Sequence, residues 1–358
     1  MTEANRHAPI KIAVIGAGAI GPRHAESIRR TAFAELTCFV DPSPGAQAIG
    51  QNFKVSVLSC VEDLVASNDL KPDAAVVCTP NDTHVSIARL LMSHGIHVLV
   101  EKPLSTTGTD GEGLVRYARS QNLRLLVGHH RRFNPFVVAT KRALEAGVVG
   151  KVIAVNGLWM TCKPPSYFEP PTAWRASTIG GVIRINFVHD IDILQHLFGP
   201  IVRVYAEKSL SHRGSEAEEG AAIVLRFQNG IVGTFLISDS TPSGHNFESG
   251  TGENPIIPKT GTDFYRIFGT EGTLSVPDMT LSKASSWADP LQQERLDVVD
   301  ATPFDLQMEH FVSVVQGLEE PSCSGEDGLR AVVVCEAVAK ALKECTPIDI
   351  LSCGGQVS

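Results

Sequence analysis

The chain has 358 residues, of which 43% are hydrophobic and 20% charged, and its formal net charge is −8. This composition is that of a folded globular protein, and the length suggests about two domains. The acidic balance without a basic block weighs against sequence-independent binding to nucleic acid. No apolar run approaches the roughly 20 residues of a membrane span. We therefore expect neither nucleic acid nor a membrane as a partner.

Residues 1–9 are polar and contain no hydrophobic signal segment, so we expect a disordered tail on a cytoplasmic protein. The eight cysteines form no Cys-x-x-Cys pair, and several lie in apolar runs such as residues 76–78. This pattern favours buried, reduced thiols over a disulfide or zinc framework, and no metal site is expected.

Residues 10–128 alternate short apolar runs with helix-like stretches. The apolar runs are residues 12–15, 36–40, 74–78, 98–100 and 123–127. The stretches between them are residues 19–30, 61–67, 83–93 and 107–121. Apolar runs of this length are typical of parallel strands buried on both faces. The pattern predicts an α/β fold in which residues 10–128 form a doubly wound, Rossmann-type domain.

From residue 129 onward the apolar runs become longer and mix with polar residues, as in half-exposed antiparallel strands. These runs are residues 152–160, 202–208, 221–227 and 231–238, and Asn229-Gly230 marks a hairpin between the last two. Helices are predicted at residues 302–317 and from Ser324 to about Lys343, with residues 240–262 a long loop.

We therefore predict that residues 129–358 form a second α/β domain with a large, open, mostly antiparallel sheet. Helices cover one face of that sheet and leave the other face open to a partner subunit. The second domain is expected to bind substrate and to mediate a homo-oligomer, either a dimer or a tetramer.

The run from Lys11 to Gly21 is a strand that leads into a Gly-x-Gly-x-x-Gly turn and then a helix. Gly16 permits the tight turn, Gly18 lets the backbone approach a pyrophosphate, and Gly21 allows close helix–strand packing. Ala19 and Ile20 complete the turn, and the free N–H groups of the helix suit an anion. The alternative is a glycine-rich turn without a ligand.

Asp41 ends the next predicted strand, where it would accept hydrogen bonds from the adenosine ribose hydroxyls. Its carboxylate would repel a 2′-phosphate, and residues 42–44 contain no Arg or Lys to neutralise one. The sequence therefore favours NAD over NADP. Arg23 could still reach the phosphates, which leaves NADP as the less favoured alternative.

Two further segments follow strands of the first domain and should face the nucleotide crevice. One contains Thr79, Pro80, Asn81 and His84, and the other is Glu101-Lys102-Pro103. Lys102 ends an apolar run, and partial burial would lower its pKa toward the range that suits acid–base catalysis. The alternative for Lys102 is a surface lysine at the start of a loop.

Together these motifs resemble the Gfo/Idh/MocA oxidoreductase family, which includes glucose–fructose oxidoreductase and inositol dehydrogenases. Residues 128–135, Trp174-Arg175, Gly180-Gly181 and residues 189–192 match the family pattern as well, so the resemblance spans nearly the whole chain. It implies a Rossmann domain, an open α/β domain, bound NAD(P), and hydride transfer at a carbon that carries a hydroxyl or carbonyl.

The resemblance also implies roles for individual residues. Lys102 corresponds to the family's catalytic lysine, and Pro103 to a proline usually preceded by a cis bond. Glu101, Asn81 and His84 would line the nicotinamide side. The residues that would reach the cofactor from beyond the Rossmann strands are Arg131, Trp174 and Arg175.

His189 matches a family histidine that contacts substrate, but Ile185 stands where relatives carry an aspartate partner for it. A proton relay through that pair is therefore in doubt, and His189 is either a catalytic, substrate-contacting group or a structural histidine. Asn186 shares a helix face with His189. Asn186 and Arg131 would orient substrate hydroxyls or a carboxylate, and the loop of Asn254 would close over them.

We therefore expect an NAD(P)-dependent dehydrogenase or reductase that acts on CH–OH groups of a small polyhydroxylated substrate: a sugar, a cyclitol or a quinate-like hydroxy acid. One alternative is a reductase of secondary-metabolite ketones or imines. Another is a non-catalytic dinucleotide-binding regulator. A regulator does not need a lysine for proton transfer, so the presence of Lys102 and His189 favours the enzyme.

Overall fold

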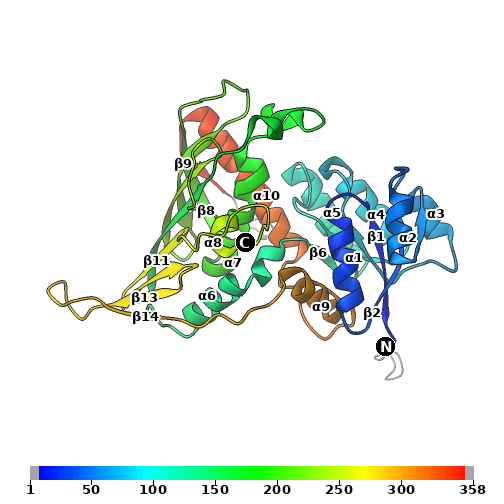
Figure 1. The fold of residues 1–358 in the computed structure, drawn as a ribbon, viewed down its shortest axis with the longest axis horizontal. Helices are drawn as coiled ribbons and strands as arrows, with labels where there is room; N and C mark the ends of the chain where they lie inside the picture. The colour runs from blue at the N-terminus through cyan, green and yellow to red at the C-terminus, as the bar shows by residue number, and fades with distance from the viewer. Residues whose placement is uncertain (1–7, 351–358) are drawn as a thin grey trace. The chain divides into compact units, whose positions relative to one another are not determined.

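The computed structural model describes residues 8–350, so most of the tail expected at residues 1–9 lies outside the described residues (Figure 1). The chain forms two compact units. The first comprises the chain up to Asn134 and Ala301–Val332, and the second comprises Pro135–Asp300 and the chain from Val333 onward. The division drawn from the sequence assigns residues 301–332 to the second domain, whereas in the structure they group with the first unit. The domain boundaries given in the sequence analysis, residues 10–128 and 129–358, stay a prediction.

The first unit is built on a six-stranded sheet in the order β3-β2-β1-β4-β5-β6. All its neighbouring strands are parallel, which confirms the Rossmann-type sheet. The strands are β1 (Ile10–Ile15), β2 (Ala34–Val40), β3 (Ser56–Leu58), β4 (Ala74–Val77), β5 (His97–Val100) and β6 (Leu125–Val127). β3 has only three residues and is partly exposed. The sequence analysis did not predict this strand, because a strand of this kind needs no continuous apolar run.

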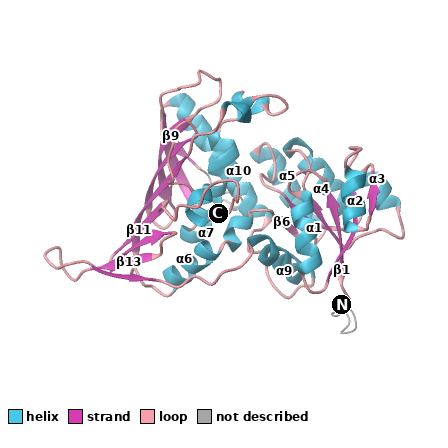
Figure 2. Cartoon of the chain, viewed as in Figure 1, coloured by secondary structure: helices cyan, strands magenta, loops and turns pink. Residues whose placement is uncertain are grey.

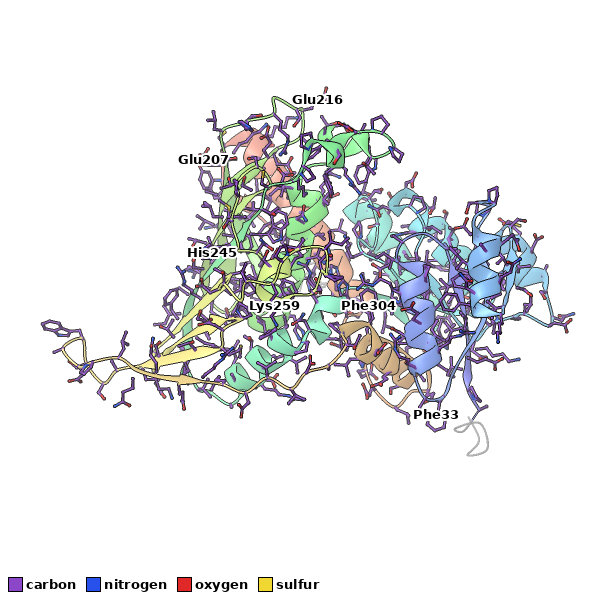
Figure 3. All side chains as sticks on the ribbon, in the orientation of Figure 1. Phe33, Glu207, Glu216, His245, Lys259 and Phe304 are labelled. Atoms are coloured by element: carbon purple, nitrogen blue, oxygen red, sulfur yellow. The ribbon has the colours of Figure 1, made fainter. Side chains whose placement is uncertain are left out.

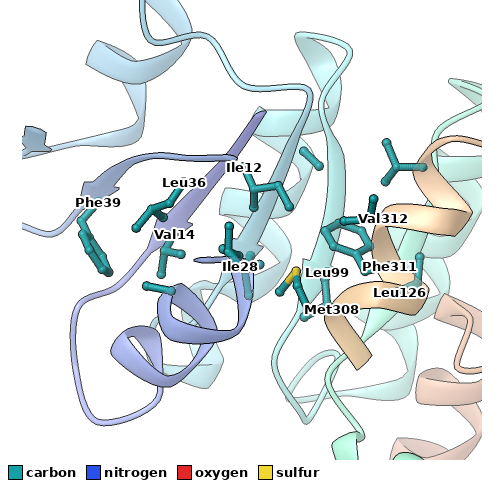
Figure 4. Close-up of a cluster of buried hydrophobic side chains, with 14 of the residues drawn as sticks. Ile12, Val14, Ile28, Leu36, Phe39, Leu99, Leu126, Met308, Phe311 and Val312 are labelled. Atoms are coloured by element: carbon teal, nitrogen blue, oxygen red, sulfur yellow. The ribbon is translucent and has the colours of Figure 1, made fainter. Parts of the chain in front are cut away.

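Helices pack on this sheet, and one of them comes from far along the chain. The helices are α1 (Gly21–Arg30), α2 (Ala46–Phe53), α3 (Val61–Ala66), α4 (His84–Ser93), α5 (Gly108–Ser120) and α9 (Pro303–Val315), with short turns η2 (Asn81–Thr83) and η3 (His130–Phe133). Figure 4 shows Met308 and Phe311 of α9 in one buried cluster with Ile12 of β1 and Ile28 of α1. Burying these side chains is what holds α9 to the first unit.

The second unit contains a nine-stranded sheet in the order β14-β13-β12-β11-β7-β10-β9-β8-β15. Its strands are β7 (Val152–Met160), β8 (Ile201–Lys208), β9 (Gly220–Phe227), β10 (Val232–Ser238), β11 (Tyr265–Gly269), β12 (Thr273–Val276), β13 (Thr280–Lys283), β14 (Gln292–Arg295) and β15 (Ile348–Asp349). Neighbours are antiparallel except β7 and β10, so the predicted, mostly antiparallel sheet is confirmed. Asn229 and Gly230 form the β9–β10 turn, where Gly230 has φ +95°.

Helices cover one face of this sheet (Figure 2). They include α6 (Pro135–Glu145), the π-helical turn η6 (Ile183–Phe187), α7 (Val188–Phe198), α8 (Phe247–Thr251) and α10 (Gly325–Glu344), which begins in the first unit, with short turns η4 (Pro165–Phe168) and η5 (Ala173–Ala176). Phe187 packs on Phe235 of β10 with ring centroids 4.6 Å apart. The predicted loop at residues 240–262 contains α8, so a continuous loop there was wrong. Within residues 8–350, no helix is long and apolar enough to cross a membrane.

Candidate functional site

The glycine-rich turn between β1 and α1 has the backbone that its sequence requires. Gly16 has φ +98°, and a Cβ there would lie 2.7 Å from the carbonyl oxygen of Cys78. A Cβ on Gly21 would lie 2.1 Å from the carbonyl oxygen of Gly16, so neither position tolerates a side chain. A Cβ on Gly18 would meet no heavy atom within 4 Å. The turn is therefore packed closely beneath and open above Gly18, as an approaching pyrophosphate requires.

The first turn of α1, which starts at Gly21, is also suited to an anion. Ile20 occupies the N-cap position and provides no side-chain hydrogen bond to the N–H groups of the helix. Uncapped N–H groups and the helix dipole together favour a phosphate at this end. The residues of the turn, Gly16 to Gly21, thus fit the pyrophosphate of a dinucleotide.

Asp41, just beyond β2, is held against the glycine-rich turn. Its Oδ2 accepts a hydrogen bond of 2.7 Å from the backbone N–H of Ala17, and its Oδ1 accepts hydrogen bonds from the N–H and hydroxyl of Ser43. Burial raises the pKa of Asp41, but these hydrogen bonds outweigh it and lower the pKa below its ordinary value. Asp41 is therefore a fixed carboxylate beside the turn, which fits ribose binding and disfavours a 2′-phosphate.

His84 connects the two loops that contain most of the remaining predicted residues of the first unit. Its Nδ1 lies 2.8 Å from the carbonyl oxygen of Pro103, and its Nε2 lies 2.9 Å from that of Thr79. The side chain is buried, so it links the loop after β4 to the loop after β5. Asn81 begins η2 in the first of these loops. The expected contact of His84 with the cofactor stays a prediction.

Glu101, directly after β5, forms a buried pair with His24 of α1. Its Oε1 lies 2.8 Å from His24 Nε2. Burial raises the pKa of Glu101, but the hydrogen bond to His24 and the nearby charges of His24, His130 and Lys102 outweigh it, and the pKa falls to about 2. Gly128 leaves room for this carboxylate, because a Cβ there would lie 2.8 Å from Glu101 Oε1.

Lys102 follows Glu101 on the loop that His84 ties down. Its backbone N–H donates a 3.2 Å hydrogen bond to Glu101 Oε2, and the bond between Lys102 and Pro103 is cis. Because the carboxyl ends of parallel strands share one sheet edge, Lys102 lies at the same edge as the glycine-rich turn. The side chain is half-buried.

Phe304, at the start of α9 and labelled in Figure 3, packs against side chains of α1 and η3. His130 stacks on its ring at 4.5 Å, and the guanidinium of Arg23 lies 4.6 Å from the ring centroid. His24 meets the same ring edge-on at 5.1 Å. Arg131, which was predicted to contact cofactor and substrate, is buried in η3 with 5% of its surface exposed.

In the second unit, Trp174 and Arg175 lie in η5. Trp174 is 43% exposed, whereas the guanidinium of Arg175 stacks 3.9 Å from the ring centroid of Tyr167. Trp174 thus offers an open aromatic surface, and Arg175 is held by a cation–π contact and a hydrogen bond to the Tyr167 carbonyl. Their contact with the cofactor stays a prediction.

Asn186 and His189 lie where η6 passes into α7. Asn186 is half-buried, and its Oδ1 accepts a 2.7 Å hydrogen bond from Lys163 Nζ. His189 is 8% exposed. Asp190 accepts a 2.5 Å hydrogen bond from the hydroxyl of Tyr265 at a fully buried position.

Asn254 lies after α8, and its side-chain oxygen accepts a 3.1 Å hydrogen bond from the backbone N–H of Ile256. This hydrogen bond joins residues two positions apart and stabilises a local turn. The expected contact of Asn254 with substrate stays a prediction.

Lys163 is a residue of the second unit that the sequence did not single out. It lies just beyond β7. Its Nζ donates a hydrogen bond to Asn186 Oδ1 and lies 3.4 Å from Asp239 Oδ2. The available signal was a lysine directly before Pro164-Pro165 at the end of a half-exposed strand. Nothing in that pattern predicts burial, because its partners come from distant segments of the chain.

Two family models match the chain. Residues 10–129 match the model described as an oxidoreductase family with an NAD-binding Rossmann fold, and residues 141–350 match the C-terminal α/β domain of the same family. The chain belongs to the Gfo/Idh/MocA oxidoreductase family. It is therefore an oxidoreductase with an NAD-binding domain, and the open turn at Gly18 with the carboxylate of Asp41 fits that cofactor.

Relatives and solved structures agree with this membership. The chain is 23% identical to the inositol 2-dehydrogenase of Rhizobium meliloti (strain 1021), over 95% of this chain and 99% of the relative. It is 27% identical to the 1,5-anhydro-D-fructose reductase of Ensifer adhaerens, over 92% and 95%. An oxidoreductase from Agrobacterium radiobacter, solved with NAD+, L-tartaric acid and magnesium, has the same fold with a TM-score of 0.82 at 19% identity, over 96% and 98%.

Proposed function

We propose that this oxidoreductase transfers a hydride between NAD and a secondary alcohol or ketone of a small polyhydroxylated molecule: a sugar, a cyclitol or a quinate-like hydroxy acid. The relatives named for inositol and anhydrofructose support the substrate class. When bound, NAD accepts the hydride in the oxidative direction and supplies it in the reductive direction.

The observation that carries the proposal is the position of Lys102. It follows β5 at the sheet edge that also holds the glycine-rich turn, and its loop is fixed by the hydrogen bonds of His84. A lysine held at the nucleotide edge can take the proton of a substrate hydroxyl or return it to a carbonyl oxygen. We assign Lys102 that role.

Other residues prepare the site. Asp41 holds the adenosine ribose, and the turn from Gly16 to Gly21 holds the pyrophosphate. The buried carboxylate of Glu101 directly precedes Lys102 in the chain, and the charge of Lys102 is one of those that lower the pKa of Glu101. His189 and Asn186 orient the reacting group by hydrogen bonds, without the aspartate partner that Ile185 replaces.

The direct test is the formation or consumption of NADH at 340 nm with a panel of sugars, cyclitols and cyclic hydroxy acids. Turnover with at least one member supports the proposal. If NAD binds tightly while no substrate of any of the three classes is turned over in either direction, the proposed substrate class is wrong.

We also propose that the enzyme is a homo-oligomer that assembles through the sheet face opposite the helices. Four apolar side chains on that face are between 38% and 49% exposed, namely Val224, Val232, Leu236 and Phe268. Their strand neighbours Ile223, Phe235 and Ile237 point the other way and are buried. Strands that alternate in this manner, with apolar residues also on the outer face, fit a second copy of the chain. The cytoplasmic location expected from the sequence stays a prediction.

Light scattering after gel filtration tests the assembly. Leu236→Arg would place a charge at the centre of this face and is expected to lower the mass to that of one chain. Leu210→Arg is the control, because Leu210 is 92% exposed in the loop after β8. An unmodified protein that is already monomeric contradicts this assembly.

A further inference from the structure

His24 is a fully buried polar side chain of α1 that the proposed mechanism does not use. It is the fourth residue of α1, which begins at Gly21 of the glycine-rich turn. None of its side chain is exposed. Its Nε2 lies 2.8 Å from Glu101 Oε1, whereas its Nδ1 is buried and has no hydrogen-bond partner within residues 8–350. The hydrogen-bonding capacity of this side chain is therefore directed at Glu101.

The direction of that hydrogen bond follows from the charge of Glu101. Its pKa is about 2, so the group is ionised at neutral pH, and an ionised carboxylate can only accept. The Nε2 atom of His24 therefore carries a proton and donates it to Oε1. The other oxygen of the same carboxylate, Oε2, accepts a 3.2 Å hydrogen bond from the backbone N–H of Lys102. One carboxylate thus connects the imidazole of α1 to the backbone of Lys102.

The imidazole of His24 is itself held by packing. The ring of Phe304 meets it edge-on, with centroids 5.1 Å apart. Phe304 belongs to α9, which is tied to α1 by Asp305. The carboxylate of Asp305 accepts hydrogen bonds of 2.6 Å from the hydroxyl of Ser27 and 2.9 Å from Nε of Arg30. These contacts fix the plane of the imidazole.

The loop that carries Lys102 is held on both sides of that residue. Before it, Glu101 Oε2 accepts from the N–H of Lys102. After it, Nδ1 of His84 lies 2.8 Å from the carbonyl oxygen of Pro103. A proton-transferring group needs such support from neighbours that do not react, because a displacement of about 1 Å can lower a rate about a hundredfold.

Resting on the proposed function, we propose that His24 is a positioning residue for the reaction. It holds the carboxylate of Glu101 and, through that carboxylate, the backbone of Lys102 at the place where the lysine meets the substrate proton. His24 itself does not touch the substrate. Because its helix also begins at the turn that fits the pyrophosphate, α1 serves both the cofactor and the lysine.

The alternative is that the pair of His24 and Glu101 only stabilises the fold. Loss of a purely structural pair lowers the free energy of unfolding and leaves kcat of the folded protein unchanged. A structural defect in α1 would also weaken NAD binding at the first turn of the helix. Loss of a positioning residue instead lowers kcat while KM and NAD affinity stay nearly constant.

Two variants that differ by one CH2 group separate these possibilities. The NH2 group of Gln in His24→Gln reaches about as far along the side chain as Nε2 of histidine, so it still donates to Glu101. The NH2 group in His24→Asn reaches only as far as Nδ1 and loses that contact. His24→Asn should lower kcat at least about tenfold and leave KM and the affinity for NADH within about threefold. His24→Gln should retain kcat within about threefold.

Hydrogen exchange of the backbone N–H of Lys102 provides a second readout that needs no turnover. In the unmodified chain this N–H should be protected by Glu101 Oε2. Its exchange should be at least about tenfold faster in His24→Asn, as expected when a hydrogen bond to a charged group is lost. In His24→Gln it should stay within about threefold.

The matched control is His97→Asn, which makes the same substitution at the opposite end of β5. Nδ1 of His97 accepts a 3.0 Å hydrogen bond from the backbone N–H of Arg124, so this histidine also has a partner but lies away from Lys102. The control should leave kcat and the exchange of Lys102 within about threefold. Thermal unfolding verifies that each variant is folded.

The proposal is overturned if His24→Asn keeps kcat within about threefold of the unmodified chain, or if His24→Gln loses as much kcat as His24→Asn. It is also overturned if the N–H of Lys102 exchanges in the unmodified chain as fast as an unprotected amide, a result that does not depend on any variant folding. An activity screen without a substrate would contradict the proposed substrate class, whereas the exchange of Lys102 would still decide whether His24 holds the loop.

Discussion

Replacing Glu101 by Gln should destabilise the first unit at neutral pH and should matter little in acid. In the folded chain the pKa of Glu101 is about 2, against an ordinary value of 4.5, because His24 and nearby positive charges outweigh burial. A pKa that is lower in the folded state adds stability above pH 4.5. That stability is lost as the pH falls from 4.5 toward 2.

The expected size follows from the same values. At roughly 1.4 kcal/mol for each pKa unit, the difference corresponds to about 3 kcal/mol of unfolding free energy. Breaking a buried charged pair by removing one partner has a comparable cost. The matched control is Glu112→Gln in α5. Glu112 is 58% exposed, so its ion pair with Arg116 should contribute only roughly a few tenths of a kcal/mol to the free energy of unfolding.

Urea unfolding at pH 7, 5, 4 and 3 measures this difference. All three tryptophans (Trp159, Trp174 and Trp287) belong to the second unit, so fluorescence reports that unit, whereas far-UV circular dichroism reports both. The dichroism transition of Glu101→Gln should lie well below that of the unmodified chain at pH 7 and approach it at pH 3. If the gap is the same at both pH values, or no larger than for Glu112→Gln, the account of the Glu101–His24 pair is wrong.

Three further outcomes are expected. The unmodified chain should bind NAD more tightly than NADP, and Asp41→Ala should narrow that difference in equilibrium titrations, whereas equal affinities in the unmodified chain would contradict the role of Asp41. His189→Asn, which keeps a donor and an acceptor, should retain more turnover than His189→Ala; if both fall to the level of Lys102→Ala, the histidine carries an essential proton. Asn186→Ala should raise KM more than it lowers kcat, as loss of an orienting contact does.

The features that the sequence predicted correctly depend on local backbone geometry. Gly16 and Gly21 were identifiable because their positions exclude a Cβ, and a motif of that kind is written in consecutive residues. The hairpin at Asn229-Gly230 is of the same type, since the turn conformation itself selects those residues.

What the sequence could not supply depends on contacts between distant residues. The apolar pattern predicted a helix at residues 302–317 but not that Met308 and Phe311 would pack on the first sheet. In the sequence, Lys163 looks like the first residue of a loop. Its partner Asp239 lies 76 residues further on and becomes its neighbour only when β7 pairs with β10. The pairing of Glu101 with His24 is likewise set by the approach of α1 to the end of β5.

The most direct test of the central claim compares NAD binding and turnover in Lys102→Ala. If Lys102 moves the substrate proton, the variant should bind NAD within a few fold of the unmodified chain while turnover falls at least about a hundredfold. Near-normal turnover with a substrate found in the activity screen would contradict the account and remove Lys102 from the reaction.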